Sequence, residues 1–184
     1  MITNEIQIVV GSWGSYNECN ERALGSEWLN LADFTDWEEI EAALTKQGFE
    51  LDGIDEELFI QDIEGLPSGC ASWDYMHPKT LFETLNAADV LTDDYRFEIM
   101  SAFIEVRSWS DFKDLVDSQG YHWDDDISLY RGMDWYDYGE EMFNCCEPKI
   151  SDHILQFFDF ERYGRYVGDC YAEEYSDGII EIRS

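Results

Sequence analysis

Carboxylates and aromatic rings alternate densely between residues 121 and 141, where the sequence reads YHWDDDISLYRGMDWYDYGEE. Carboxylates at such spacing could bind a metal ion, move protons in an acid/base reaction, keep a segment disordered or attract a cationic partner. The remainder of the sequence discriminates among these four interpretations.

No motif supports the metal or catalytic interpretations. The three histidines, His77, His122 and His153, stand apart without an HExxH motif, and no cysteine and histidine group has the spacing of a zinc site. The acidic run at 124–126 lacks the glycine and the distal glutamate of a calcium-binding EF-hand loop. The sequence has no GxxxxGK[ST], GxGxxG or GxSxG motif. We therefore expect no cofactor, no metal and no catalytic residue, although 42 acids leave a carboxylate pair for glycoside chemistry open without singling one out.

The net charge separates the remaining interpretations. With 42 Asp and Glu against 11 Lys and Arg, the formal charge is −31, and such a field repels nucleic acid. Disordered acidic chains are poor in aromatic residues, whereas this one has 7 Trp, 11 Tyr and 11 Phe. We expect a folded protein that does not bind DNA or RNA directly, and a merely solubilising acidic surface stays a simple alternative.

The cysteines and the N-terminus indicate the compartment. Five cysteines, Cys19, Cys70, Cys145, Cys146 and Cys170, form no CxxC pair, which is typical of reduced thiols. The first residues, MITNEIQIVVGSW, lack a positively charged region and a long apolar run. We expect a cytoplasmic protein without membrane contact.

The elements that would position the carboxylates begin with a small sheet. Residues 5–10 and 57–65 have the pattern of strands, and Thr35 with Glu38 has the spacing of a capping box at the start of a helix. The apolar face of this helix contains Trp37, Ile40 and Leu44. Pro67 and Gly69 then mark a boundary.

The middle of the chain has the period of helices. One helix is expected from Pro78, a second from near Thr92, and a third from Ser108 with Asp111 as its cap. Their apolar faces contain Leu81, Leu85 and Ala88, then Phe97, Met100 and Ile104, then Phe112, Leu115 and Val116. No helix face is rich in Lys or Arg, which argues against a DNA-reading helix.

The last third returns to mixed structure. A strand is expected at 127–131, a helix at 133–146 that ends before Pro148, a further segment at 151–165, and a hairpin that turns at Asp177–Gly178. We therefore predict an α+β protein of three small domains in series: 1–73 (α+β), 74–118 (helical) and 119–184 (α+β). Their formal charges are −14, −6 and −11, so the carboxylates belong to folded elements and not to a tail.

Four stretches stand in the order found in ArdA antirestriction proteins, and the chain resembles that family from end to end. They read IVVGSWGSYNE with LGSEWLNL, then FIQDIEGLP, DWYDYGEEMFNCCE and FFDFERYGRYV. The matching positions are Tyr16, Asn17, Gly25, Trp28, Leu29, Asp62, Glu64, Pro67, Tyr136, Asp137, Glu140, Glu141, Glu147, Asp159, Tyr163, Gly164 and Arg165. Gly139, the pair Cys145 and Cys146, and Phe160 depart from the family pattern.

The resemblance implies a fold and a function. It implies an elongated three-domain chain that dimerises through its C-terminal domain and inhibits type I restriction-modification enzymes by imitating B-form DNA, without catalysis. Duplex DNA has one charge per about 1.7 Å of axis, so 31 charges correspond to roughly 50 Å of duplex. An acidic adaptor or chaperone for another cationic protein is the alternative, and a carboxylate-dependent hydrolase comes third.

Two sets of residues are candidates for the site. The partner-binding carboxylates are Asp52, Asp55, Glu56, Glu57, Asp93, Asp94, Asp111, Asp114, Asp117, Asp124, Asp125 and Asp126. The antirestriction motif and dimer contact comprise Trp135, Tyr136, Asp137, Glu140, Glu141, Phe143 and Glu147. We expect the carboxylates to face outward while the aromatic residues among them stabilise the scaffold and the dimer.

Overall fold

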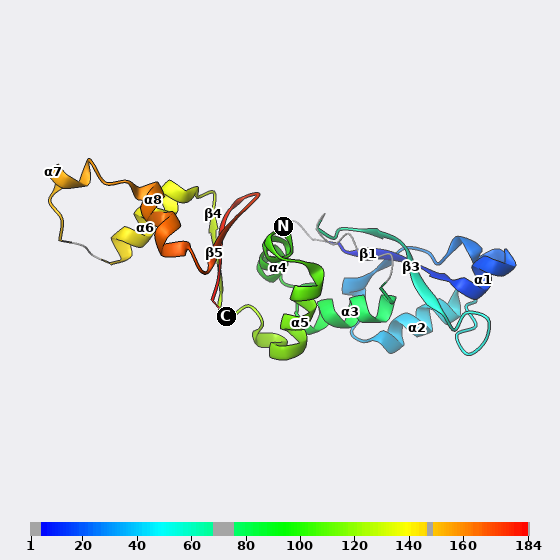
Figure 1. The fold of residues 1–184 in the computed structure, drawn as a ribbon. Coiled ribbons are helices and arrows are strands. Elements are labelled where there is room, and N and C mark those ends of the chain that lie inside the picture. Colours follow the sequence, from blue (N-terminus) through cyan, green and yellow to red (C-terminus); the bar gives the residue numbers. More distant parts are fainter. Residues whose placement is uncertain (1–4, 68–75, 147–148, 184) are drawn as a thin grey trace. The chain divides into compact units, whose positions relative to one another are not determined.

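The computed structural model describes residues 5–67, 76–146 and 149–183, and the chain divides into two compact units, 1–123 and 124–184. Each unit combines helices with a three-stranded antiparallel sheet in its described part (Figure 1). The expected α+β class is confirmed. The division into three domains stays a prediction, and Gly69 at the expected boundary lies outside the described residues.

The sheet of unit 1 has the strand order β2-β1-β3, formed by β1 (Gln7–Ser12), β2 (Leu29–Asn30) and β3 (Leu58–Glu64). The central strand β1 is buried over most of its length, and its register with β3 shifts between Val9 and Val10. Short helices, α1 (Trp13–Glu18), η1 (Glu21–Leu24) and η2 (Leu31–Asp33), follow β1 and β2. The two strands predicted from residues 5–10 and 57–65 are confirmed.

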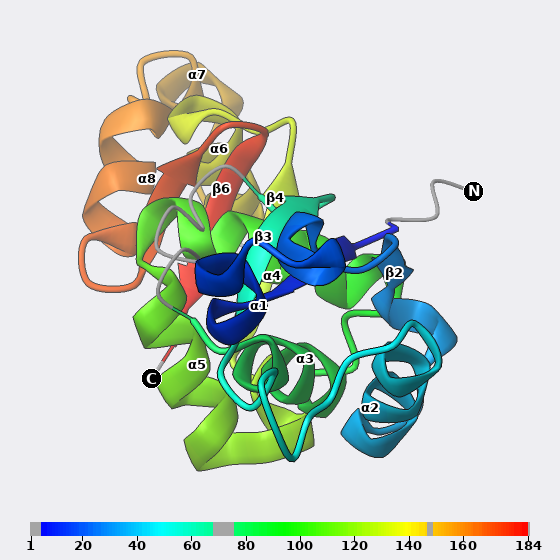
Figure 2. The ribbon, with the colours of Figure 1, turned by 90° about the vertical axis from the view of Figure 1, so that its right-hand side faces the viewer.

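Helices complete unit 1. They are α2 (Trp37–Lys46), α3 (Pro78–Ala87), α4 (Asp94–Val106), α5 (Trp109–Gln119) and the 3₁₀-helix η4 (Gly120–His122). Two views show α2 and α3 next to each other on one side of β1 and β3 (Figures 1 and 2). The predicted helix starts at Pro78 and Ser108 are confirmed, since Pro78 is the first residue of α3 and Ser108 Oγ accepts a hydrogen bond from Asp111 N.

The start of α2 differs by one residue from the prediction. Asp36, and not Thr35, is the N-cap, because its carboxylate accepts a hydrogen bond from Glu39 N at 3.0 Å. The Glu39 carboxylate in turn accepts from Thr35 N at 2.8 Å. Either Thr or Asp can cap a helix, so the sequence alone left the two neighbours nearly equivalent. The predicted apolar face of Trp37, Ile40 and Leu44 is buried, as expected.

A buried arginine joins the helices of unit 1. The guanidinium of Arg96 in α4 donates to Ala88 O at 3.2 Å and to Tyr121 O at 2.8 Å, and lies 3.9 Å from the Tyr121 ring centroid. Trp123 Nε1 also donates to Ala88 O, at 3.0 Å. The carbonyl at the end of α3 is thus satisfied from two directions, which fixes α3, α4 and η4 together.

Unit 2 has the strand order β4-β6-β5, formed by β4 (Ile127–Arg131), β5 (Ala172–Tyr175) and β6 (Gly178–Ile182). Between β4 and β5 lie α6 (Trp135–Cys145), α7 (Asp152–Leu155) and α8 (Phe160–Gly168). The predicted closing hairpin is confirmed, but Tyr175 pairs with Gly178. The two loop residues are therefore 176 and 177, one position earlier than predicted.

Two glycines set the close crossing of α6 and α8. A Cβ on Gly139 would lie 1.9 Å from Phe160 O, and a Cβ on Gly164 would lie 2.4 Å from Trp135 O. No real side-chain atom fits at such distances, so only glycine allows the two backbones to approach this closely. This explains why Gly139 departs from the helix-forming residue that the family pattern led us to expect.

Candidate functional site

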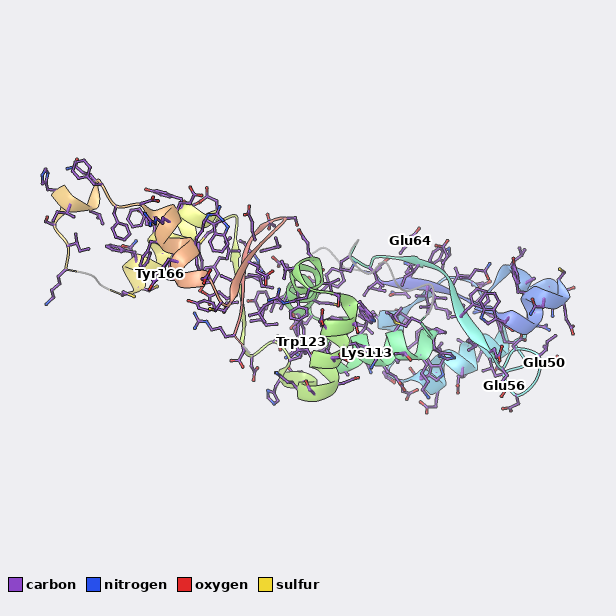
Figure 3. The ribbon with its side chains drawn as sticks, in the orientation of Figure 1. Glu50, Glu56, Glu64, Lys113, Trp123 and Tyr166 are labelled. Atoms are coloured by element: carbon purple, nitrogen blue, oxygen red, sulfur yellow. The ribbon has the colours of Figure 1, made fainter. Side chains whose placement is uncertain are left out.

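Carboxylates cover the surface of both units. Among the Asp and Glu side chains that the structure describes, only Asp55 and Glu181 are buried. Glu50, Glu56 and Glu64 are exposed and project from the ribbon of unit 1 (Figure 3). The cores are built from apolar and aromatic residues, and nearly all of the described negative charge is in contact with water.

Most of the predicted partner-binding carboxylates are exposed. Asp93 and Asp124 are half-buried, and the exposed members are Asp52, Glu56, Glu57, Asp94, Asp111, Asp114, Asp117, Asp125 and Asp126. Asp62 and Glu64 of β3 are exposed as well. Both of these belonged to the family resemblance, but we had not included them among the contacts. The alternation of polar and apolar residues along that strand was the signal that could have identified them.

The prediction that Asp55 faces a partner is wrong, because the Asp55 side chain is completely buried. Its carboxylate accepts hydrogen bonds from Ser15 Oγ, from Glu50 N at 2.8 Å and from Arg22 Nε at 3.0 Å. Burial alone would raise the pKa of Asp55, but these hydrogen bonds and the Arg22 charge outweigh burial and lower it. Asp55 is an internal anchor that joins α1, η1 and the loop before β3.

Three other predicted carboxylates have local structural partners. Asp93 is the N-cap of α4 and accepts from Tyr95 N and Arg96 N, while Asp111 accepts from Ser108 Oγ at 2.5 Å. Asp117 forms an ion pair with Lys113 one turn earlier in α5, at 2.5 Å. Their charges stay near the surface, but part of each carboxylate's hydrogen-bonding capacity is used within the chain.

The predicted antirestriction motif forms α6 and presents its polar side chains outward. Tyr136, Asp137, Glu140 and Glu141 are exposed, whereas Glu147 lies outside the described residues. Asp134, which we had not included, is the N-cap and accepts from the N–H groups of residues 136 and 137. The helix thus places three of the motif's carboxylates toward solvent.

Phe143 was predicted as a dimer contact, but it belongs to the core of its own unit. It is 7% exposed and packs against Phe158, Phe160 and Tyr163. Trp135 is half-buried, and its Nε1 donates to the Glu174 carboxylate at 3.1 Å. The motif's aromatic residues mainly hold α6 against α8 and the sheet.

A buried tyrosine and glutamate pair lies beneath the motif, and no sequence pattern indicated it. Tyr138 is fully buried, and its hydroxyl donates to Glu181 Oε1 at 2.5 Å. Burial and the neighbouring Glu181 charge raise the pKa of Tyr138, so it stays a donor at neutral pH. Arg183 Nη2 lies 2.6 Å from the other carboxylate oxygen. One carboxylate oxygen of Glu181 therefore has a hydrogen-bond donor, and the other lies beside a positive charge.

Exposed apolar residues lie in and directly after α7, and one lies on α8. Ile154 is 58% exposed, Phe157 is 77% exposed and Tyr166 is 79% exposed. Sequence analysis did not select them, although the segment HILQFF is conspicuously apolar for a region so acidic. They are better candidates for a contact between copies than Phe143.

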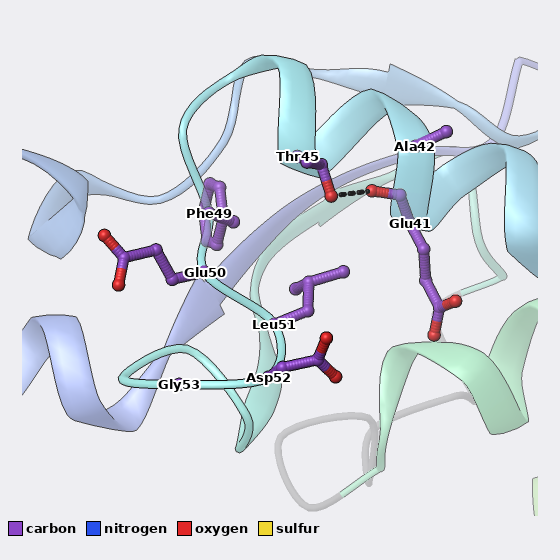
Figure 4. A pocket seen from close by; sticks show the side chains of 8 residues that line it. All are labelled: Glu41, Ala42, Thr45, Phe49, Glu50, Leu51, Asp52 and Gly53. Atoms are coloured by element: carbon purple, nitrogen blue, oxygen red, sulfur yellow. Dashed lines mark hydrogen bonds between the residues drawn. The ribbon is translucent and has the colours of Figure 1, made fainter.

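A hollow in unit 1 has three carboxylates among its lining residues. It measures about 730 Å³ and is lined by Glu41, Ala42, Thr45, Phe49, Glu50, Leu51, Asp52 and Gly53. Glu50 points away from Glu41 and Asp52 (Figure 4). Glu41 already accepts a hydrogen bond from Trp37 Nε1 at 2.7 Å. Within the described residues, no group of three His, Cys, Asp or Glu is placed to hold a metal ion.

Across residues 5–67, 76–146 and 149–183, none of the helices is both long and apolar enough to span a membrane.

Comparison with protein-family models identifies a family that matches the chain. A family model described as "Antirestriction protein (ArdA)" matches residues 8–181, a range that includes nearly all of both units. No curated protein matches the chain.

Proposed function

The chain belongs to the ArdA antirestriction protein family, and we propose that it inhibits type I restriction-modification enzymes by filling their DNA-binding groove with its surface carboxylates. The observation that carries this proposal is the segregation of charge. Among the described carboxylates all but Asp55 and Glu181 have access to solvent, in a chain with a formal charge of −31. A cationic groove that binds phosphates attracts such a surface at long range.

The spacing of the carboxylates on α5 supports the comparison with a duplex. Asp111, Asp114 and Asp117 are three residues apart, so they share one face of the helix. Successive members rise by about 4.5 Å along the axis, and each strand of a duplex carries one phosphate per roughly 3.4 Å of axis. The axial spacing of these carboxylates is therefore of the same order as that of the phosphates on one DNA strand, and Lys113 offsets one of the three charges.

The dimer belongs to the same proposal. We place the contact between copies in the C-terminal domain, residues 119–184, and centre it on Ile154, Phe157 and Tyr166. Their exposure supports this choice, because apolar and aromatic residues are enriched at the centres of interfaces. The protein would act in the cytoplasm, where the enzymes that it inhibits meet incoming DNA, and would require no cofactor.

Competition with DNA tests the mimicry. Protein and duplex should exclude one another from the enzyme, and raising the salt concentration should weaken both complexes by screening. Because duplex DNA also releases condensed counterions, the protein should show the shallower salt dependence. Titration into an enzyme–DNA complex at two salt concentrations measures both effects.

A stable ternary complex with DNA still in the groove would contradict the proposal and support an acidic adaptor instead. In cells, the plating efficiency of unmodified phage on a restricting host, with and without this gene, measures antirestriction itself. Rescue of phage without competition for the groove would keep the family function and refute mimicry.

A further inference from the structure

An exposed aromatic cluster lies at the beginning of α1 in unit 1. The Trp13 indole stacks on the Phe59 ring with centroids 4.3 Å apart and 25° between the planes. Tyr16 meets Trp13 edge-on at 6.0 Å. Trp13 is nevertheless 45% exposed and Tyr16 is 55% exposed. The fold thus keeps aromatic surface in water at a place where its own core does not cover it.

The backbone holds these rings in fixed positions. Ser12 Oγ accepts from Ser15 N and caps α1, and Trp13 N donates to Glu57 O at 3.0 Å. Gly11 makes room for Phe59, because a Cβ at Gly11 would lie 2.5 Å from that ring. The Ser12 cap, the backbone bond to Glu57 and Gly11 together hold the aromatic rings in place before any ligand binds. Binding would therefore require little free energy to order them.

The surroundings of the cluster select the chemistry of a ligand. Glu18 ends the same helix, Glu57 is bonded to Trp13 through its backbone, and both residues are exposed. Aromatic faces attract cations, and a planar guanidinium can stack on an indole while its edge N–H groups bond carboxylates. A lysine ammonium cannot do both, because it is a compact and strongly hydrated point charge.

We propose that the cluster of Trp13, Tyr16 and Phe59 is a receptor for arginine side chains of the protein partner. The inference rests on the proposed function, in which that partner is the DNA-binding groove of a restriction enzyme. Carboxylates on the rest of the surface attract both Arg and Lys at long range. The cluster adds a preference for Arg that charge alone does not provide.

Peptides test the receptor without any restriction enzyme. Oligoarginine and oligolysine peptides of equal length are titrated into the protein by calorimetry at constant salt. The oligoarginine should bind about two- to fivefold more tightly, which is the range of an exposed cation–π contact. In the variants Trp13→Ala and Tyr16→Ala this preference should fall, while overall attraction to the acidic surface persists.

Matched controls separate this effect from loss of structure. Tyr95→Ala removes an aromatic ring of α4 that is 49% exposed and lies outside the cluster, and it should keep the preference for arginine. Tyr16→Ala is a second variant that should disturb the fold less than Trp13→Ala, because Tyr16 contributes only an edge contact to the cluster. Thermal unfolding of each variant establishes that unit 1 is intact.

The results of peptide binding and sedimentation distinguish an arginine receptor from its alternatives. Equal binding of both peptides to the wild-type protein, or an arginine preference that is as large in Trp13→Ala as in the wild type, would overturn the proposal. A change in sedimentation of Trp13→Ala would identify the cluster as a contact between copies, which also overturns it. Arginine preference in a protein that fails to compete with DNA would refute the proposed function and leave the receptor standing.

Discussion

Replacing the buried Asp55 by Asn should destabilise unit 1, although the same change at exposed carboxylates should not. The Asp55 carboxylate accepts from Ser15, from Glu50 N and from the Arg22 guanidinium. Removing one partner of a buried charge pair costs about 3–5 kcal/mol. The Arg22 side chain is 24% exposed and can be hydrated, so we expect a loss of about 2–4 kcal/mol in the free energy of unfolding.

The pH dependence of this loss has a defined sign. The folded-state pKa of Asp55 lies below its ordinary value of 3.8, so its ionised form stabilises the fold above that pH. This contribution disappears as the pH falls through the folded-state pKa. The difference between wild type and Asp55→Asn should therefore be full at pH 7 and should shrink as the solution is acidified below 3.8.

Urea unfolding of both proteins over this pH range measures the difference, and Asp52→Asn is the matched control. Asp52 is exposed three residues earlier in the same loop, so its replacement should change stability by less than about 0.5 kcal/mol. General repulsion among the carboxylates affects wild type and variants alike and cancels in the comparison. Equal unfolding free energies for Asp55→Asn and Asp52→Asn at pH 7 would refute the assignment of Asp55 as an internal anchor.

Three further changes test the crossing of α6 and α8, the dimer and the distribution of binding. Gly139→Ala should lower the free energy of unfolding by at least about 2 kcal/mol in a thermal unfolding experiment, because the new Cβ would lie 1.9 Å from Phe160 O. The better helix propensity of Ala does not offset this clash. The control Glu140→Ala should be nearly neutral. Phe157→Asp should yield folded monomers by light scattering, and a wild-type protein that is monomeric at micromolar concentration would remove the dimer proposal. Asp125→Asn should leave antirestriction almost unchanged, since one exposed charge contributes at most about 1 kcal/mol; its complete loss in a folded variant would indicate a catalytic or metal site.

Periodicity made the helices and strands of this chain predictable. The apolar residues of α2 and α3 recur at helical spacing, and β6 follows a short turn after β5, so local pattern and final structure coincide. The N-cap of α2 was predicted one residue too early, because both Thr35 and Asp36 can accept a backbone hydrogen bond. Local sequence therefore indicated the elements but left their ends uncertain.

Non-local contacts explain what the sequence could not indicate at the site. Asp55 belongs to an acidic run with Glu56 and Glu57, and only contacts with Ser15 and Arg22, 40 and 33 residues away, distinguish it from its exposed neighbours. The role of Gly139 likewise depends on α8, a separate helix. Burial of one carboxylate in a run, or the approach of two helices, has no signature in composition or spacing.

Negative charge serves the fold of this protein as well as its surface. Aspartates cap α2, α4, α6 and α8, where a carboxylate satisfies free backbone N–H groups and opposes the positive end of the helix dipole. The last turns of α5 and α6 contain no basic residue, so the negative ends of these helices are not compensated within the helix. Their carbonyl groups therefore add to the potential of the carboxylates around them. A cationic groove would meet both sources of negative potential at once, which is why replacing a single carboxylate should remove so little of the attraction.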